Sequence, residues 1–276
     1  MKKSINGWTF PPDRPLAEVA EAVRAAGFDA FEPTLGAEGE LATTTAEAAC
    51  RKVGDQIREA GLEVASLACG LFWQASYTSP DPADRARAKE WTIAGLDRAK
   101  WLGTDALLVV PGLVSHFEQP TKPVTGYAQA LDLAFEALRE LAPEAEARGV
   151  AIAVENVWNQ FLLSPVEMRD LIDRVNSPGV KAYLDVGNIL KFGFPQDWIN
   201  ILGKRIVRIH LKDFKIAVGN IDGFCPLGDG DADWPAVMAA LKRHGYDGPL
   251  TYEGPGDLAD ISQRIDRVLT HAYQGW

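Results

Sequence analysis

The chain repeats one pattern of apolar and polar positions. An amphipathic helical stretch is followed by a glycine, and the glycine by a short apolar run that ends in polar residues. After a first apolar run, the pattern occurs seven times, at Gly27, Gly61, Gly103, Gly149, Gly179, Gly203 and Gly245. Glycine adopts left-handed backbone angles without a steric penalty, so each of these glycines predicts the end of a helix before a strand.

The apolar runs predict strands that are buried on both faces. They are short, partly β-branched and nearly continuous, as in residues 106–110 and 151–154. With the run at residues 3–6 there are eight of them, and helical stretches such as residues 127–147 lie between them. Eight strands alternating with helices predict an α/β fold, a single (β/α)₈ TIM barrel.

The length of the chain fits one barrel domain over residues 1–276, because α/β barrels routinely reach about 250 residues. The Pro-rich stretch 118–124 and the Gly-containing stretch 218–231 are too short for interdomain linkers, and we interpret both as long loops. A doubly wound open sheet is the alternative architecture. Its dinucleotide-binding form is disfavoured because no G-x-G-x-x-G follows the first strand.

Composition and charge argue against several classes of partner. The formal net charge of −10 would repel a nucleic acid, and no basic stripe offsets it. No segment reaches the roughly 18 apolar residues of a membrane span, and no apolar stretch follows the first two lysines. Cys50, Cys69 and Cys225 lack C-x-x-C spacing and predict neither a disulfide framework nor a thiolate metal site. We therefore expect a cytoplasmic protein that binds neither nucleic acid nor membrane.

The ends of the predicted strands carry the candidate chemistry, because barrel active sites lie at the C-terminal ends of the strands. Strands five to eight end, in order, in Glu155, Asp185, His210 and Glu253. Consecutive strands would point these side chains into one half of the mouth. Three carboxylates there would raise one another's pKa values unless a cation lay between them. Three oxygen donors and one imidazole predict one divalent ion, Mn²⁺, Mg²⁺, Co²⁺ or Zn²⁺.

Further residues near the strand ends are candidates for contact with a small substrate. Aromatic residues follow strands one, three and five, and such rings pack well against the C–H faces of sugars. Polar residues end or follow strands two, six and seven. We interpret six residues as substrate-binding: Trp8, Glu32, Phe72, Trp158, Asn188 and Lys212. A structural role under a loop or at the rim is the alternative for each.

Five segments resemble the xylose-isomerase-like TIM-barrel sugar isomerases and epimerases. They are VENVWN (154–159), YLDVGN (183–188), RIHLKDFK (208–215), PLGDGDADW (226–234) and GYDGPLTYEG (245–254). The closest likeness is to the branch of hexulose-6-phosphate isomerases and L-xylulose-5-phosphate 3-epimerases. The resemblance implies an enzyme of carbohydrate metabolism that holds one divalent metal, such as manganese, at Glu155, Asp185, His210 and Glu253.

The resemblance also implies a mechanism. The metal would chelate the carbonyl and adjacent hydroxyl of a ketose or ketose phosphate and stabilise the cis-enediolate. Glu155 and Glu253, on opposite faces, would remove and return the proton, which inverts the carbon; return to the neighbouring carbon by the same base would exchange aldose and ketose. Ketose 3-epimerases of free sugars usually carry a histidine where this chain has Asn188, which fits the phosphosugar branch.

The sequence leaves the substrate and the reaction open. The loop glycines Gly228 and Gly230, with nearby lysines, could bind a phosphate, whereas the aspartates of the loop oppose it and Asp233 could simply cap the next helix. A lyase of the inosose-dehydratase type would use the same metal and carboxylates. A non-catalytic sugar-binding barrel would not need both Glu155 and Glu253. The oligomeric state is also open, a homo-oligomer included.

Overall fold

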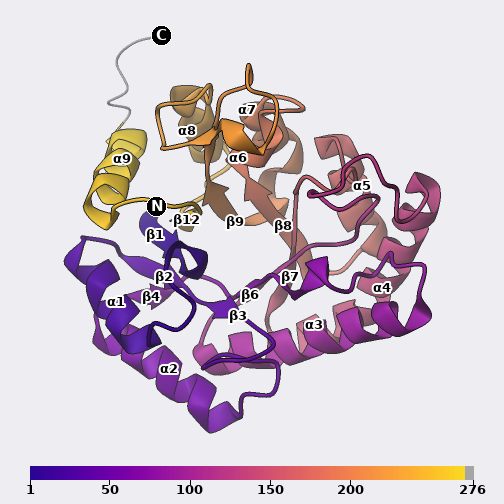
Figure 1. Cartoon of the computed structure of the whole chain (residues 1–276), viewed down its shortest axis with the longest axis horizontal. Helices are drawn as coiled ribbons and strands as arrows, with labels where there is room; N and C mark the ends of the chain where they lie inside the picture. The colour runs from indigo at the N-terminus through magenta and orange to yellow at the C-terminus, as the bar shows by residue number, and fades with distance from the viewer. Residues whose placement is uncertain (271–276) are drawn as a thin grey trace.

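The computed structural model describes residues 1–270, and they form a TIM barrel (Figure 1). Eight parallel strands form one sheet in the order β4-β2-β1-β12-β9-β8-β7-β6. Their bounds are β1 Lys2–Asn6, β2 Ala30–Glu32, β4 Glu63–Val64, β6 Ala106–Val109, β7 Ala151–Glu155, β8 Val180–Asp185, β9 Ile206–Leu211 and β12 Pro249–Tyr252. The predicted barrel fold is therefore confirmed, and the doubly wound alternative is wrong.

The sheet closes on itself between β4 and β6 through a single bridge. Leu67 pairs with Leu107, and Leu67 O accepts a hydrogen bond of 2.9 Å from Leu108 N. A short parallel pair, β3 (Thr34–Leu35) and β5 (Ala68–Cys69), continues this side toward the mouth. The barrel is thus interrupted beside β4, whereas β6, β7, β8 and β9 pair continuously, with one register shift at Ala182/Tyr183 between β8 and β9.

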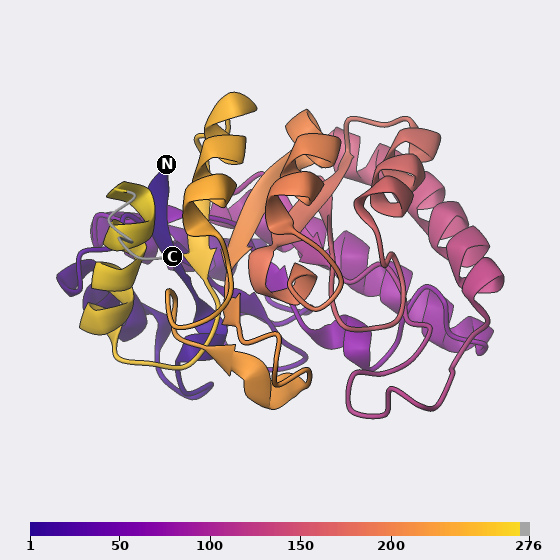
Figure 2. The ribbon, with the colours of Figure 1, turned by 90° about the horizontal axis from the view of Figure 1, so that it is seen from above.

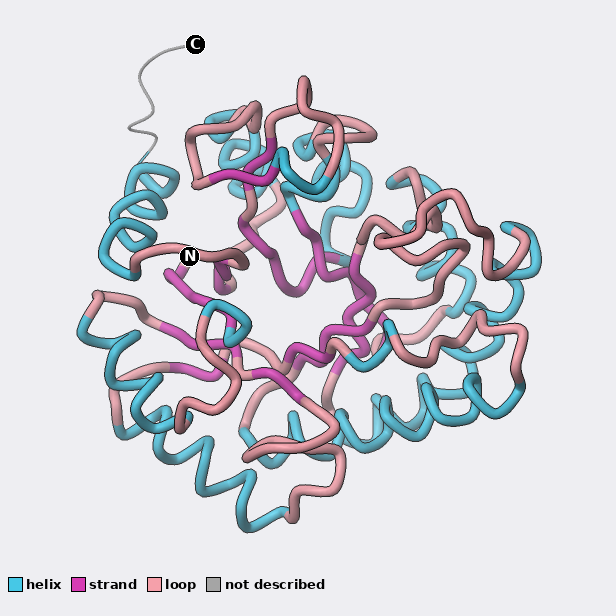
Figure 3. The backbone as a smooth tube through the Cα atoms, in the orientation of Figure 1, coloured by secondary structure: helices cyan, strands magenta, loops and turns pink. Residues whose placement is uncertain are grey.

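Helices surround the strands, as the backbone tube in Figure 3 shows. Outside the sheet lie α1 Leu16–Ala25, α2 Glu47–Glu59, α3 Pro82–Leu102, α4 Tyr127–Arg148, α5 Pro165–Val175, α7 Pro195–Leu202, α8 Trp234–Arg243 and α9 Leu258–Thr270. The mouth holds the short α6 (Val186–Ile189), the 3₁₀ helices η1 (Gly7–Thr9), η2 (Leu71–Trp73) and η4 (Ile221–Gly223), and a small antiparallel pair, β10 (Asp213–Phe214) with β11 (Phe224–Cys225). A further 3₁₀ helix, η3 (Gly203–Arg205), leads into β9. None of the helices that the structure describes combines the length and the apolar character needed to cross a membrane.

The long loops after the strands project from one side of the barrel (Figure 2). All of the glycines that predict helix ends, except Gly179, have φ between 53° and 88°. At the end of α5 the left-handed residue is instead Asn176, with φ 54°. The prediction for Gly179 was wrong because asparagine tolerates this conformation too and here ends the helix earlier.

The core fills the barrel and the layer between the sheet and the helices. Inside the barrel, below the mouth, the side chains of Ala68, Leu108, Ala153 and Tyr183 form a buried cluster. These residues come from the successive elements β5, β6, β7 and β8, so one side of the ring supplies this buried cluster.

The contact between α2 and α3 yields a test of this packing. A Cβ added at Gly54 would lie 2.5 Å from the backbone oxygen of Leu102, which cannot move without separating the helices. We expect Gly54→Ala to lower the free energy of unfolding by about 1–3 kcal/mol, measured by urea denaturation. Gly126→Ala is the control, because a Cβ there meets no atom within 4 Å. Equal stability of the two variants would contradict this account.

Candidate metal centre

The four predicted ligands converge at the C-terminal mouth of the barrel. Glu155 ends β7, Asp185 ends β8, His210 lies in β9, and Glu253 directly follows β12. β8 and β9 pair in a register that places Asp185 beside His210. One ligand atom from each of the four residues lies within 4.8 Å of the others. Adjacent strands of one barrel therefore gather groups that are up to 98 positions apart in the sequence.

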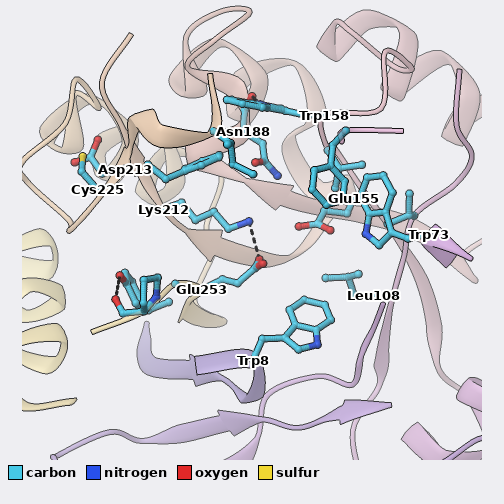
Figure 4. A pocket seen from close by; sticks show the side chains of 18 of the residues that line it. Trp8, Trp73, Leu108, Glu155, Trp158, Asn188, Lys212, Asp213, Cys225 and Glu253 are labelled. Carbon is cyan, nitrogen blue, oxygen red and sulfur yellow. Dashed lines mark hydrogen bonds and ion pairs between the residues drawn. The ribbon is translucent and has the colours of Figure 1, made fainter. Parts of the chain in front are cut away.

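Two basic groups lie among the three carboxylates. His210 Nδ1 is 2.7 Å from Glu253 Oε2 and 3.1 Å from Glu155 Oε1. Lys212 Nζ is 2.9 Å from Glu253 Oε2 and 3.1 Å from Asp185 Oδ2. Figure 4 shows the lysine reaching toward Glu253 along the pocket wall. The negative charge of the cluster is thus balanced from β9 and from the residue that follows it.

Glu32 lies beneath this cluster and not in the pocket. It is fully buried, and its Oε2 is 2.7 Å from His210 Nε2. The hydroxyls of Ser66 and Tyr183 and the amide of Asn6 donate hydrogen bonds to the same carboxylate. The interpretation of Glu32 as a substrate contact was wrong, because these four partners occupy its oxygens. Instead it orients His210 so that Nδ1 faces the other three carboxylates.

Burial and charge set the protonation of the carboxylates. Burial raises the pKa of Glu155 to about 7, although His210 opposes the shift. Burial also raises the pKa of Asp185 above its usual value. Burial would raise the pKa of Glu253 too, but the charges of Lys212 and His210 hold it at about 2. Glu155 and Glu253 belong to the same cluster, yet their carboxyl groups therefore titrate in very different pH ranges.

The histidine is held charged in spite of its burial. Burial alone would lower its pKa, but the charges of Glu32 and Glu253, together with hydrogen bonds to the carboxylates, hold the pKa of His210 well above the usual range. Burial alone would raise the pKa of Glu32, but the charge of His210 and hydrogen bonds from His210, Ser66 and Asn6 hold the pKa of that carboxyl low. The two residues form a buried ion pair.

The donor set fits a divalent metal. Asp185 Oδ2 and Glu253 Oε2 are buried and accept no hydrogen bond of favourable geometry, although Lys212 lies near both. A buried oxygen without a well-placed donor is costly, and coordination to a cation would satisfy it. Carboxylates with one imidazole suit divalent ions from Mg²⁺ to Zn²⁺.

The ends of β7 and β8 are tied together by two asparagines. Asn156 and Asp185 exchange hydrogen bonds of 2.9 Å between the asparagine amide and the aspartate backbone. Asp185 Oδ1 then accepts from Asn188 N, which caps the one-turn helix α6. A Cβ at Gly187 would collide with Lys212, so the turn needs glycine there. The VEN and DVGN motifs thus build the framework that aims Asp185 and Lys212.

Asp213 has a structural role that the sequence did not indicate. Its buried carboxylate accepts hydrogen bonds from the backbone of Phe214, Gly228 and Ala232 and from the indole of Trp234. One acidic side chain therefore shapes the loop that follows β9. A signal for it was available, because the acid directly follows the candidate Lys212 and precedes a loop rich in glycine.

The cluster forms part of the wall of a cavity of about 580 Å³. Four of the predicted substrate contacts line this cavity: Trp8, Trp158, Asn188 and Lys212. Lys212 does so while paired with two of the predicted ligands. Trp158 is fixed by a hydrogen bond of 3.0 Å from its indole nitrogen to Asn188 O.

Phe72 does not reach the cavity. It is fully buried and packs edge-on against Tyr77, with 5.8 Å between ring centroids. Its neighbour Trp73 lines the cavity instead. The prediction for Phe72 was wrong because residues 71–73 form a 3₁₀ turn, in which successive side chains point about 120° apart.

Comparison with known proteins places the chain among sugar-epimerase relatives. A putative L-ribulose-5-phosphate 3-epimerase of Escherichia coli is 25% identical over 236 residues, which cover 83% of this chain and 80% of that protein. A 2-epi-5-epi-valiolone 7-phosphate 2-epimerase of an Actinoplanes species is 29% identical over 212 residues, covering 76% and 71%. An uncharacterized protein of Methanocaldococcus jannaschii is 24% identical over 190 residues, covering 65% of this chain and 62% of that protein.

Solved structures share the fold over nearly the whole chain. A D-psicose 3-epimerase crystallised in the presence of D-fructose superposes with a TM-score of 0.80 at 18% identity, covering 99% of this chain and 98% of that one. A 3-keto-D-glucoside 4-epimerase from E. coli gives 0.79 at 17% identity, covering 98% and 99%.

A family model decides the assignment that the strand-end motifs suggested. The model of the xylose isomerase-like TIM barrel matches residues 20–270, which include every strand from β2 to β12. The chain therefore belongs to the xylose isomerase-like TIM-barrel family.

Proposed function

We propose that the protein is a divalent-metal-dependent epimerase of a keto sugar. The observation that carries this proposal is the placement of Glu155 and Glu253. Both line the cavity, yet they come from strands that β8 and β9 separate in the sheet. Figure 4 shows their carboxylates approaching the pocket from different sides. Two acid–base groups on different sides of a planar intermediate are what inversion of a carbon requires.

Glu155, Asp185, His210 and Glu253 would hold the ion. When bound, the metal supplies Lewis-acid polarisation of the sugar carbonyl. One glutamate removes the proton from the carbon beside that carbonyl, and the other delivers a proton to the opposite face. Return of the proton to the neighbouring carbon would give aldose–ketose isomerisation instead.

The surrounding residues would bind and orient the sugar. Trp8, Trp158 and Asn188 line the cavity, and the ammonium of Lys212 lies beside Glu253. The relatives that act on sugar phosphates and the crystallised epimerases support a keto sugar as the substrate class. A lyase on the same carboxylates would release water, which product analysis by NMR distinguishes from inversion.

Metal binding is the first test. We expect Mn²⁺ to raise the melting temperature and a chelator to reverse the rise, because a ligand at about 100 times its Kd stabilises the folded state by about 2.7 kcal/mol. Asp185→Ala and His210→Ala should lose metal in elemental analysis while keeping the far-UV CD spectrum. Asp132→Ala, an exposed acid on α4, is the matched control. Full metal occupancy in both site variants would refute the ligand assignment.

The two glutamates give the second test. Glu155→Gln and Glu253→Gln each remove one proton carrier, so each should lower the epimerisation rate by at least about 10²-fold. The variant that retains the removing base should still exchange substrate hydrogen with D₂O without completing inversion. Inversion at the wild-type rate in both variants would show that the acid–base groups lie elsewhere.

Glu32 gives a test of positioning. Glu32→Gln keeps the shape of the side chain but removes the charge that orients His210, and we expect a roughly 10–100-fold weaker Mn²⁺ affinity by calorimetry. Ser66→Ala is the control, since it removes one hydrogen bond to Glu32 and leaves the charge in place. An unchanged affinity in Glu32→Gln would mean that the imidazole is oriented by its other contacts.

A further inference from the structure

The cavity is larger than a single sugar ring needs. Its volume of about 580 Å³ lies within the range of about 300–1,000 Å³ that accommodates drug-sized ligands. A hexose has only about a dozen non-hydrogen atoms and fills part of such a space. The lining is mainly apolar, with six aromatic side chains: Trp8, Trp73, Phe117, Trp158, Phe224 and Tyr252. Space with apolar walls is therefore left beside a keto sugar bound at the carboxylates.

An aromatic surface lies on the side of the pocket away from Lys212, where Figure 4 shows Trp8 and Trp73. Trp73 packs edge-on against Phe117, with 4.9 Å between ring centroids. Trp8 packs over Gly70 and is 44% exposed. These residues follow β1, β5 and β6, whereas the predicted ligands come from β7, β8, β9 and β12. Trp8 is exposed and Trp73 is partly buried, and indole rings that line a cavity are suited to stacking against a sugar ring.

The cavity offers little to a phosphate. Among the described residues that line it, three are acids, Glu155, Asp213 and Glu253, and the one cation is Lys212. That ammonium is already paired with Asp185 and Glu253. Lys191, near the rim, lies over the ring of Trp158 at 4.3 Å. The lining side chains that the structure describes therefore offer a phosphate acids and one paired ammonium, and no other cation.

The backbone amides where barrels often bind phosphate are also taken. The N-terminus of α8 is capped by Asp233, which accepts from Ala236 N at 3.0 Å. The N-terminus of α9 is capped by Asp257, which accepts from two amides at 3.0 Å. Gly228 N donates to Asp213. After each of the last two strands a carboxylate thus occupies the place where phosphate would bind.

We propose that the substrate is a neutral keto sugar that carries a second sugar ring. The keto ring binds at the carboxylate cluster, and the second ring stacks on the surface formed by Trp8 and Trp73. This inference rests on the proposed function, and it disfavours the phosphosugar substrate that the DVGN motif suggested.

The test compares three probes on the Mn²⁺-loaded protein: fructose, fructose 6-phosphate and a glucosyl-fructose with a free ketose end. Calorimetry measures each Kd, and NMR in D₂O measures hydrogen exchange next to the carbonyl. Glucosyl-fructose should bind about tenfold more tightly than fructose, the order of effect of one stacked ring, and fructose 6-phosphate should bind more weakly than fructose. Trp73→Ala should remove most of the advantage of the disaccharide. Trp101→Ala, on α3 outside the cavity, is the matched control and should leave the order unchanged.

The outcomes separate this inference from the proposed function. Exchange into fructose combined with tighter binding of fructose 6-phosphate than of glucosyl-fructose would overturn the substrate class and leave the epimerase intact. A disaccharide advantage that survives Trp73→Ala would overturn the stacking surface. If no probe binds or exchanges although Mn²⁺ is bound, both the substrate class and the proposed function are wrong.

Discussion

The crowding of negative charge at the barrel mouth is the constraint on which the site depends. Three carboxylates and an imidazole offer ligand atoms within 4.8 Å of one another, in surroundings where burial raises carboxyl pKa values. The repulsion within such a cluster falls when a carboxyl takes up a proton or when cations lie among the carboxylates. His210 and Lys212 supply positive charge here, and the arrangement leaves two carboxylate oxygens poorly satisfied. A divalent ion at the carboxylates would supply more positive charge and would also coordinate these two oxygens.

The residues around the cluster hold its acidic and basic side chains in place. Glu32 fixes one nitrogen of His210 from below, so the other nitrogen faces the carboxylates. Asn156 locks the end of β7 to the end of β8, and Gly187 lets Lys212 come close. The Asn156 and Gly187 contacts join neighbouring strand ends, whereas the Glu32–His210 contact spans the barrel interior from β2 to β9. Contacts between neighbouring strands and across the barrel therefore together hold the like charges close to one another.

The mouth divides into two parts with different tasks. The half formed by β7, β8, β9 and β12 carries the predicted ligands, and the half that follows β1, β5 and β6 carries Trp8, Trp73 and Phe117 and, among the described residues, no acidic or basic side chain that lines the cavity. In barrels the strands hold the shared chemistry and the loops vary the substrate. Family membership therefore supports the assignment of the ligands on β7, β8, β9 and β12. The identity of the sugar depends instead on the residues that follow β1, β5 and β6 and on the acids that cap α8 and α9.

The sequence by itself determined the fold class and the family, because a repeated helix–glycine–strand pattern has few ways to bury its strands, and residues that end parallel strands must meet at one edge. The convergence of Glu155, Asp185, His210 and Glu253 followed from that rule, although their role as ligands is a proposal. Only the tertiary structure decided which way individual side chains face. Glu32 and Phe72 were misassigned because a position at or after the end of a strand does not say whether a side chain points into the cavity or the core. Asp213 was missed because its partners lie up to 21 positions further along the chain. The direction of a side chain and its hydrogen bonds to distant residues are decided in the closed barrel, because packing against neighbouring side chains determines which space is open to it.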